Sequence, residues 1–214
     1  MKERILKHLK AIVYILLPFV GGGWLGAACS QNDATTDVHA NWQERNDAFF
    51  ASLEDSLTRG TGIWKKIKSF SKTTDKNTDY VYVQVIPTGQ ETGQTTSPTF
   101  NDSVRLSYEG RLMPTAIPLN GKGFTDGAVF DTTIYGSYNP QTNATVSFKV
   151  STLVNGLTSA LLYMHRGDTW LVYIPYALGY NDKADNTKIP AYSTLIFKVT
   201  LYDFAAEGNK LPKM

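Results

Sequence analysis

The sequence predicts an α+β fold in which one short helix covers a face of an antiparallel sheet. Two observations carry this prediction. Several short segments alternate apolar and polar residues with a period of two, as half-buried strands do. A single later segment, residues 153–163, is apolar at the spacing of a helix instead. A series of strands with one short helix is typical of an α+β layer and not of alternating parallel units.

The composition supports a folded core and excludes several classes of protein. The chain has 214 residues, of which 42% are hydrophobic and 19% charged, so wholesale disorder is excluded. Residues 1–28 carry four basic residues against Glu3, and the rest carries 17 basic and 18 acidic residues, so we expect no nucleic-acid partner. One cysteine and three scattered histidines give no disulfide framework and no metal-ligand spacing, so we expect neither a metal nor a cofactor.

Residues 1–28 are predicted to be a signal peptide. A basic segment at 1–10 precedes ten apolar residues at 11–20, a length typical of a signal-peptide core. The run LGAA at 25–28 then leads to Cys29, which resembles the lipidated cysteine of a bacterial lipoprotein. A membrane span over 11–30 and ordinary secretion with an incidental cysteine remain open as alternatives. We expect a mature protein in the cell envelope, anchored through a lipid on Cys29 to the outer membrane, on its periplasmic or surface side.

A helical segment is predicted ahead of the sheet. Residues 30–37 are small and polar and are expected to form a tether. An amphipathic helix is predicted within 38–59, where the apolar positions are Trp42, Phe49, Phe50, Leu53 and Leu57. The apolar spacing over 63–70 predicts a second short helix, with the three lysines of this segment on its solvated face.

The strands are predicted from β-branched and aromatic residues that alternate with polar ones. They cover residues 80–86, 104–108, 145–150, 170–174 and 195–201, and the strand that starts at Val104 is expected to stop at Gly110. The chain therefore divides into a signal peptide at 1–28, a tether and helical segment at 29–79, a sheet domain at 80–205 and a tail at 206–214.

Seven short motifs between residues 103 and 204 resemble, in the same order, those of the FKBP-type peptidyl-prolyl cis-trans isomerases. They are VRLSYEG at 104–110, GAVFDTT at 127–133, Phe148 in the next strand, LVNGL at 153–157, MHRGDTW at 164–170, IPYALGY at 174–180 and IPAYSTLIF at 189–197. Any one motif alone is a weak signal, and their common order makes the resemblance specific. They cover about half of the chain.

The resemblance implies a twisted antiparallel sheet wrapped around the short helix, with an apolar pocket between them. Position in the motifs implies catalytic roles for Tyr108, Phe130, Asp131 and Tyr180, and substrate-binding roles for Phe148, Leu153, Val154, Leu157, Ile189 and Phe197. The implied activity is isomerisation of X–Pro bonds in proline-containing polypeptides, which would assist protein folding in the bacterial cell envelope. The resemblance also implies a homodimer formed through residues 38–70.

Structural roles compete with these functional ones. Phe148 and Phe197 suit the core of a sheet, and Asp131 suits the cap of a turn. Leu157 stands where the family often has tryptophan, which predicts weaker isomerase activity.

The alternative function is that of a non-catalytic FKBP-like binding or structural module of an envelope lipoprotein. The long connection at 111–125 motivates it together with Leu157. An open cavity favours catalysis, whereas a cavity filled by Met113, Ile117 or Leu119 favours the alternative.

Overall fold

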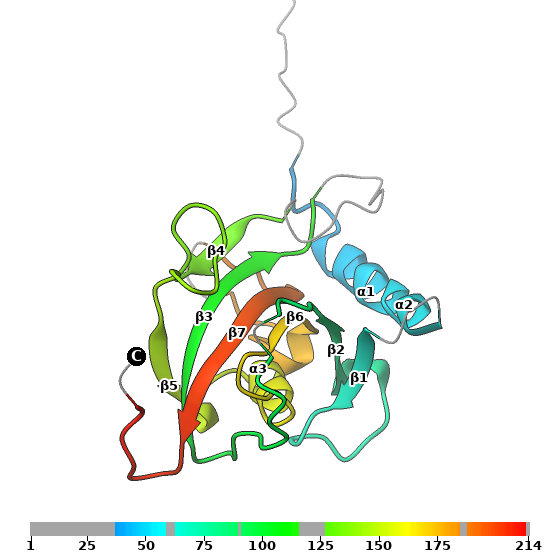
Figure 1. Cartoon of the computed structure of the whole chain (residues 1–214). Helices are drawn as coiled ribbons and strands as arrows, with labels where there is room; N and C mark the ends of the chain where they lie inside the picture. The colour runs from blue at the N-terminus through cyan, green and yellow to red at the C-terminus, as the bar shows by residue number, and fades with distance from the viewer. Residues whose placement is uncertain (1–36, 59–62, 90, 116–126, 185–187, 213–214) are drawn as a thin grey trace, which may run out of the picture. The chain divides into compact units, whose positions relative to one another are not determined.

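A curved antiparallel sheet is the framework of the protein (Figure 1). The computed structural model describes residues 37–58, 63–89, 91–115, 127–184 and 188–212. Within these ranges the strands are β1 (Trp64–Lys68), β2 (Tyr80–Val85), β3 (Ser103–Leu112), β4 (Val129–Thr132), β5 (Val146–Lys149), β6 (Thr169–Ile174) and β7 (Leu195–Ala205). Their order is β1-β2-β6-β7-β3-β4, and β5 pairs with the same edge of β3 that β4 uses further along. The α+β prediction is therefore confirmed.

Short helices complete the fold. The α-helices of the described chain are α1 (Trp42–Ser52), α2 (Glu54–Thr58) and α3 (Asn155–Leu161), and the 3-10 helices are η1 (Asn77–Asp79), η3 (Val150–Thr152) and η4 (Tyr176–Leu178). The sheet curves around α3, while α1 and α2 lie beside β1 and β2 (Figure 1). The helix predicted within 38–59 is present as two consecutive helices, α1 and α2, and the one predicted within 153–163 is present as the shorter α3.

The apolar side chains of β2, β6 and β7 alternate between the two faces of the sheet, as a period of two requires. We call the face that packs against α3, together with the apolar side chains of that helix, the α3 layer. It includes Ile67, Val81, Val83, Leu157, Leu161, Trp170, Val172, Ile174, Leu195, Phe197, Val199 and Leu201. The opposite face, which we call the α1 layer, contains Phe50, Leu53, Tyr82, Leu171, Tyr173 and Ile196. The sheet therefore has an apolar layer on each side.

The predicted second helix over 63–70 is wrong, because this segment forms β1. Trp64 lies opposite Gln84 and Ile67 opposite Val81 in an antiparallel pair with β2. Side chains of β1 then serve both faces, with Ile67 in the α3 layer and Trp64 packed against the α1 layer. On their own, the apolar residues of this segment fit the period of a helix as well as that of a strand. Pairing with the open edge of β2 selects the strand.

The lysines of β1 are also not a solvated helix face. Lys66 donates to Glu54 at 2.8 Å, and the Lys65 ammonium lies 4.9 Å from the centre of the Trp170 ring. Lys68 reaches Asp75 at 3.4 Å. The two ion pairs, with Glu54 and Asp75, are at the surface, where such pairs contribute about 0–1 kcal/mol each, so they do not determine that this segment forms a strand.

The strand that starts at Ser103 does not stop at Gly110 as predicted, and continues to Leu112 as β3. It pairs along its whole length with β7, from Ser103 opposite Ala205 to Leu112 opposite Leu195. The β3–β4 register shifts between Gly110 and Arg111, so the glycine accommodates an irregularity inside the strand and does not end it.

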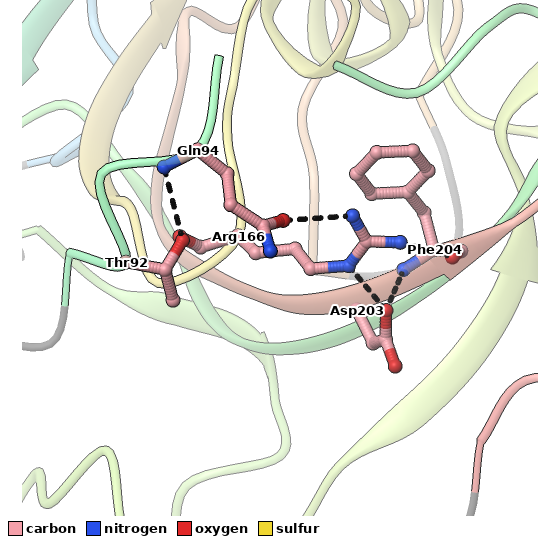
Figure 2. A network of polar contacts seen from close by, with 5 residues as sticks. All are labelled: Thr92, Gln94, Arg166, Asp203 and Phe204. Atoms are coloured by element: carbon pink, nitrogen blue, oxygen red, sulfur yellow. Dashed lines mark hydrogen bonds and ion pairs between the residues drawn. The ribbon is translucent and has the colours of Figure 1, made fainter. Parts of the chain in front are cut away.

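A polar network around Arg166 holds the loop before β3 against the end of β7 (Figure 2). The Arg166 guanidinium donates to Asp203 at 2.5 Å, to the Gln94 side chain at 3.1 Å and to the Phe204 carbonyl at 2.8 Å. It also lies 3.8 Å from the centre of the Phe204 ring, while the Thr92 hydroxyl donates to the Arg166 carbonyl at 3.0 Å. One partly buried cation thus fixes a long loop by several contacts at once.

Candidate active site

A cavity of about 490 Å³ lies between the start of α3 and the strands that curve around it. It is lined by Leu106, Tyr108, Phe130, Asp131, Phe148, Thr152, Leu153, Val154, Leu157, Tyr180, Lys188, Ile189 and Phe197. All ten candidate residues named from the sequence are in this set, so the fold brings them together although they span 90 positions of the chain. The volume is in the range of sites that bind small molecules or a few residues of a peptide.

Aromatic side chains from four strands form the walls of this cavity. Phe130 on β4 and Phe197 on β7 meet edge to face, with ring centres 5.4 Å apart. Tyr108 on β3 lies 6.0 Å from Phe197 and 6.2 Å from Phe148 on β5. These separations are typical of favourable aromatic pairs, so the rings support one another as well as the cavity.

Gly110 makes the close approach of two of these rings possible. A Cβ atom at this position would lie 2.5 Å from Cζ of Phe130 and 3.0 Å from Cε1 of Phe197. Any side chain here would therefore push both rings out of place. The motif glycine that was expected to end the strand instead shapes the wall of the cavity.

The floor of the cavity is the first turn of α3. Leu157 is 4% exposed, and Leu153 and Val154 precede it at the entry to the helix. Gly156 lets the helix approach the sheet, because a Cβ atom there would lie 2.3 Å from Cγ2 of Ile174. The Thr158 hydroxyl donates to the Val150 carbonyl at 2.9 Å and links the helix to η3. The floor is thus apolar and closely packed on β6.

One rim of the cavity is polar. The Tyr108 hydroxyl donates to Oδ2 of Asp131 at 2.6 Å. Burial first, and then this hydrogen bond to the carboxylate, hold the pKa of Tyr108 well above its usual value. The hydroxyl therefore stays protonated at any physiological pH, and the pair keeps a fixed orientation. The Asp131 carboxylate is thus part of the rim, where it accepts the hydrogen bond from Tyr108.

Three lining residues were not named from the sequence. Leu106 is two positions before Tyr108 on β3, so the period of the strand could have found it. Thr152 belongs to η3, a 3-10 turn that no motif marks. Lys188 is exposed next to Ile189, and its ammonium approaches the Phe130 carbonyl at 3.4 Å. Only tertiary packing places these last two at the cavity.

Met113, one of the side chains that the alternative function would place in the cavity, is fully buried in the core and does not line the cavity. Ile117 and Leu119 lie outside the described residues, as do Cys29 and the predicted signal peptide at 1–28. In the part of the chain that the structure describes, no helix has the length and apolar character of a membrane span. The same residues contain no cluster of three or more acidic, histidine or cysteine side chains suited to a metal ion.

Fold and cavity together define a class: a domain in which an antiparallel sheet wraps a short helix and encloses an aromatic pocket between them. Residues 94–202 match the family described as FKBP-type peptidyl-prolyl cis-trans isomerase. This match covers half of the chain, and the chain belongs to that family.

Two relatives and one solved structure illustrate the relationship. The chain is 35% identical over 111 residues to the peptidyl-prolyl cis-trans isomerase Mip of Coxiella burnetii. The aligned residues make up 52% of this chain and 40% of the relative. The chain is 31% identical over 124 residues to the outer membrane protein MIP of Legionella longbeachae, covering 56% and 46%. The chain thus spans less than half of the length of each relative.

The fold is similar to a crystal structure of a peptidyl-prolyl cis-trans isomerase from Pseudomonas syringae pv. tomato, with a TM-score of 0.53 and 18% identity. This similarity covers 78% of the present chain and 96% of the other, so it extends beyond the family match to residues ahead of position 94.

Proposed function

We propose that this protein is a peptidyl-prolyl cis-trans isomerase that assists protein folding in the bacterial cell envelope. The observation that carries the proposal is the cavity of about 490 Å³ with aromatic walls and an aliphatic floor, in a domain of the isomerase family. Its substrates would be proline-containing polypeptides, and its chemistry would require neither a metal nor a cofactor.

The reaction is a rotation, so the pocket needs no nucleophile. Amide resonance imposes a barrier of about 18–20 kcal/mol on this rotation. In the twisted transition state resonance is lost, and the carbonyl is less dipolar than in the planar ground state. An apolar pocket therefore stabilises the twisted amide relative to the solvated planar one, which is differential binding of the transition state. Each tenfold acceleration requires about 1.4 kcal/mol of such stabilisation, an amount that a few contacts supply.

The proposed roles follow from the position of each side chain around the cavity. Phe130, Phe148 and Phe197 would enclose the proline ring, above a floor of Leu153, Val154 and Leu157. The backbone N–H of Ile189 and the Tyr180 hydroxyl would hold peptide carbonyls on either side of the rotating bond. Tyr108 and Asp131, already joined at the rim, would polarise its edge.

The proposed location is the envelope side of a bacterial membrane, through a lipid anchor on Cys29. The motif at 25–29 supports this, and one relative carries the description outer membrane protein. Mass spectrometry of the mature protein tests the anchor, and an unmodified Cys29 would contradict it.

The proposed homodimer through residues 38–70 is constrained by the packing of α1. This helix buries Trp42, Asn46 and Phe50 within its own chain. A partner subunit would therefore have to use the remaining, exposed side of the helix.

The test of the proposal is isomerisation of a tetrapeptide that contains one X–Pro bond, followed with micromolar purified protein. We expect exchange clearly faster than the uncatalysed reaction, which takes roughly tens to hundreds of seconds. A matched control is Phe70→Ala, because this aromatic residue is 46% exposed and does not line the cavity. No acceleration by the unaltered protein would reject catalysis and leave a non-catalytic FKBP-like module, a function in keeping with Leu157 at the floor.

A further inference from the structure

Helix α1 is hydrogen-bonded to the segment Ile189–Thr194, which connects the cavity to β7. Asn46 of α1 is fully buried, and its side-chain oxygen accepts a hydrogen bond from the Thr194 backbone N–H at 2.7 Å. Its amide nitrogen donates to the Trp42 carbonyl at 2.7 Å. The two partners define the orientation of this amide, because one can only donate and the other can only accept.

A second connection starts one turn earlier in the same helix. The Trp42 indole nitrogen donates to the Ser193 hydroxyl at 2.9 Å, and that hydroxyl donates to the Pro190 carbonyl at 2.6 Å. Trp42 is 7% exposed, and its hydrogen bond to Ser193 is buried. Pro190 directly follows Ile189, whose side chain lines the cavity. Helix α1 therefore contacts the segment next to the lining residue Ile189 through two side chains that are four positions apart.

The Ile189–Thr194 segment needs such support because its backbone is strained. Tyr192 has a φ of 61°, and Asn181, whose carbonyl accepts a hydrogen bond from the Tyr192 N–H at 2.9 Å, has a φ of 62°. A non-glycine residue in this region costs about 1–3 kcal/mol, and tyrosine gains no local hydrogen bond from its side chain that would offset it. Conformations of this kind persist where surrounding structure holds them.

We propose that α1 is a positioning element of the active site, and that Asn46 and Trp42 hold the Ile189–Thr194 segment in the conformation that presents Ile189 to the substrate. This inference rests on the proposed isomerase function. It assigns a role to the helical segment ahead of the family match, which begins only at residue 94.

The chemistry of the contact favours positioning over simple packing. Phe50, on the same face of α1, packs edge to face with Tyr82 in the α1 layer, with ring centres 5.1 Å apart. Such a contact stabilises the helix and leaves no buried polar group unpaired if it shifts. Asn46 instead carries the cost of burying an amide, which is recovered only if its partners stay in place. A leucine would secure the helix at lower cost, but it would not select one backbone position for Thr194.

The test compares Asn46→Ala and Trp42→Phe with Phe50→Leu, a matched control on the same helix face that leaves the two connections intact. We expect Asn46→Ala to lower kcat/KM for a proline peptide by about tenfold, since small displacements of positioning groups are costly. We also expect the Tyr192 amide, which donates to the Asn181 carbonyl at 2.9 Å, to exchange hydrogen about tenfold faster, because local opening of the segment is easier. Phe50→Leu should lower Tm while both quantities stay within about twofold of their original values.

The outcomes separate this inference from the proposed function. If the loss of kcat/KM is in the same proportion to the loss of Tm in all three variants, the positioning role is overturned. If the unaltered protein shows no isomerase activity, the proposed function is rejected, yet hydrogen exchange at the Tyr192 amide still decides whether α1 holds the segment. Should Asn46→Ala fail to fold, Trp42→Phe and Ser193→Ala decide the matter. Trp42→Phe removes the indole donor and Ser193→Ala removes both hydrogen bonds of that hydroxyl, while each variant keeps most of the side-chain volume.

Discussion

The two apolar layers of this protein share one sheet but differ in how completely they are covered. The α3 layer meets a helix of seven residues, which is about 10 Å long at 1.5 Å per residue. Strand β3 alone has ten residues and extends about 33 Å. Helix α3 is therefore too short to cover its face, and the cavity lies at its first turn. The α1 layer is instead covered by α1 and α2 with Phe50, Leu53 and their neighbours.

The difference teaches that the cavity is a consequence of element lengths as much as of particular side chains. Aromatic residues surround the opening because a large planar side chain can wall a cavity from a strand without filling it. On the opposite face aromatic residues such as Tyr82 and Tyr173 pack against α1 and against β1. Similar side chains thus have different functions on the two faces, and substitutions should separate these functions.

The largest effect on stability is expected in the α1 layer. Leu171 on β6 is 9% exposed and belongs to that layer. Leu171→Ala should lower the free energy of unfolding by about 2–5 kcal/mol, because it removes buried methyl groups and leaves a cavity. Urea unfolding measures this change. The isomerase activity of the folded fraction should be unchanged, and a parallel loss of activity would show that the two layers are not functionally separate.

At the wall of the cavity, substitutions are expected to affect catalytic activity. Phe130→Ala should lower kcat/KM by about 100-fold, equivalent to about 2.7 kcal/mol of transition-state stabilisation, since it opens the pocket to water. Tyr180→Ala should lower it as well, because a hydrogen bond to the substrate is lost. Asp131→Asn should have the smallest effect of the three, because an amide oxygen still accepts from the Tyr108 hydroxyl. Equal activity in all three variants would show that the pocket is misassigned.

The α3 layer could be predicted from the sequence because its information is local and ordered. Six of the seven motifs place one to three lining residues each on their own strand or turn, and their order along the chain determines which strands meet. Phe130 and Phe197 could therefore be assigned to one pocket although 67 positions separate them. Lys188 and Thr152 were missed because nothing in their neighbourhood distinguishes a lining residue from a surface one.

The α1 layer could not be predicted in the same way. Trp64 and Ile67 fit a helix as well as a strand, and only the edge of β2 selects the strand. Asn46 is polar in an amphipathic pattern, where the natural interpretation is a residue that faces solvent. Its partner is the backbone N–H of Thr194, 148 positions away, and a backbone donor leaves no trace in the sequence. Contacts of this kind require the fold to be known first.

The smallest expected effect is a loss of stability at alkaline pH that comes from Tyr173, a buried tyrosine of the α1 layer. Burial raises the pKa of Tyr173 from 10.0 to about 12. Between these values the unfolded chain has lost the phenolic proton and the folded protein still holds it. The free energy of unfolding contributed by Tyr173 is therefore fully present below pH 10 and falls as the pH rises toward 12, by at most about 1.4 kcal/mol per pH unit.

Tyr173→Phe isolates this contribution from that of every other group that titrates in the same range. Urea unfolding of both proteins at intervals from pH 8 upward gives the difference in their free energies of unfolding. The difference should be constant below pH 10 and then shift in favour of the phenylalanine variant, because phenylalanine has no proton to lose. A difference that stays constant across this range would mean that the Tyr173 hydroxyl titrates equally in both states, as it would if the α1 layer were open to water.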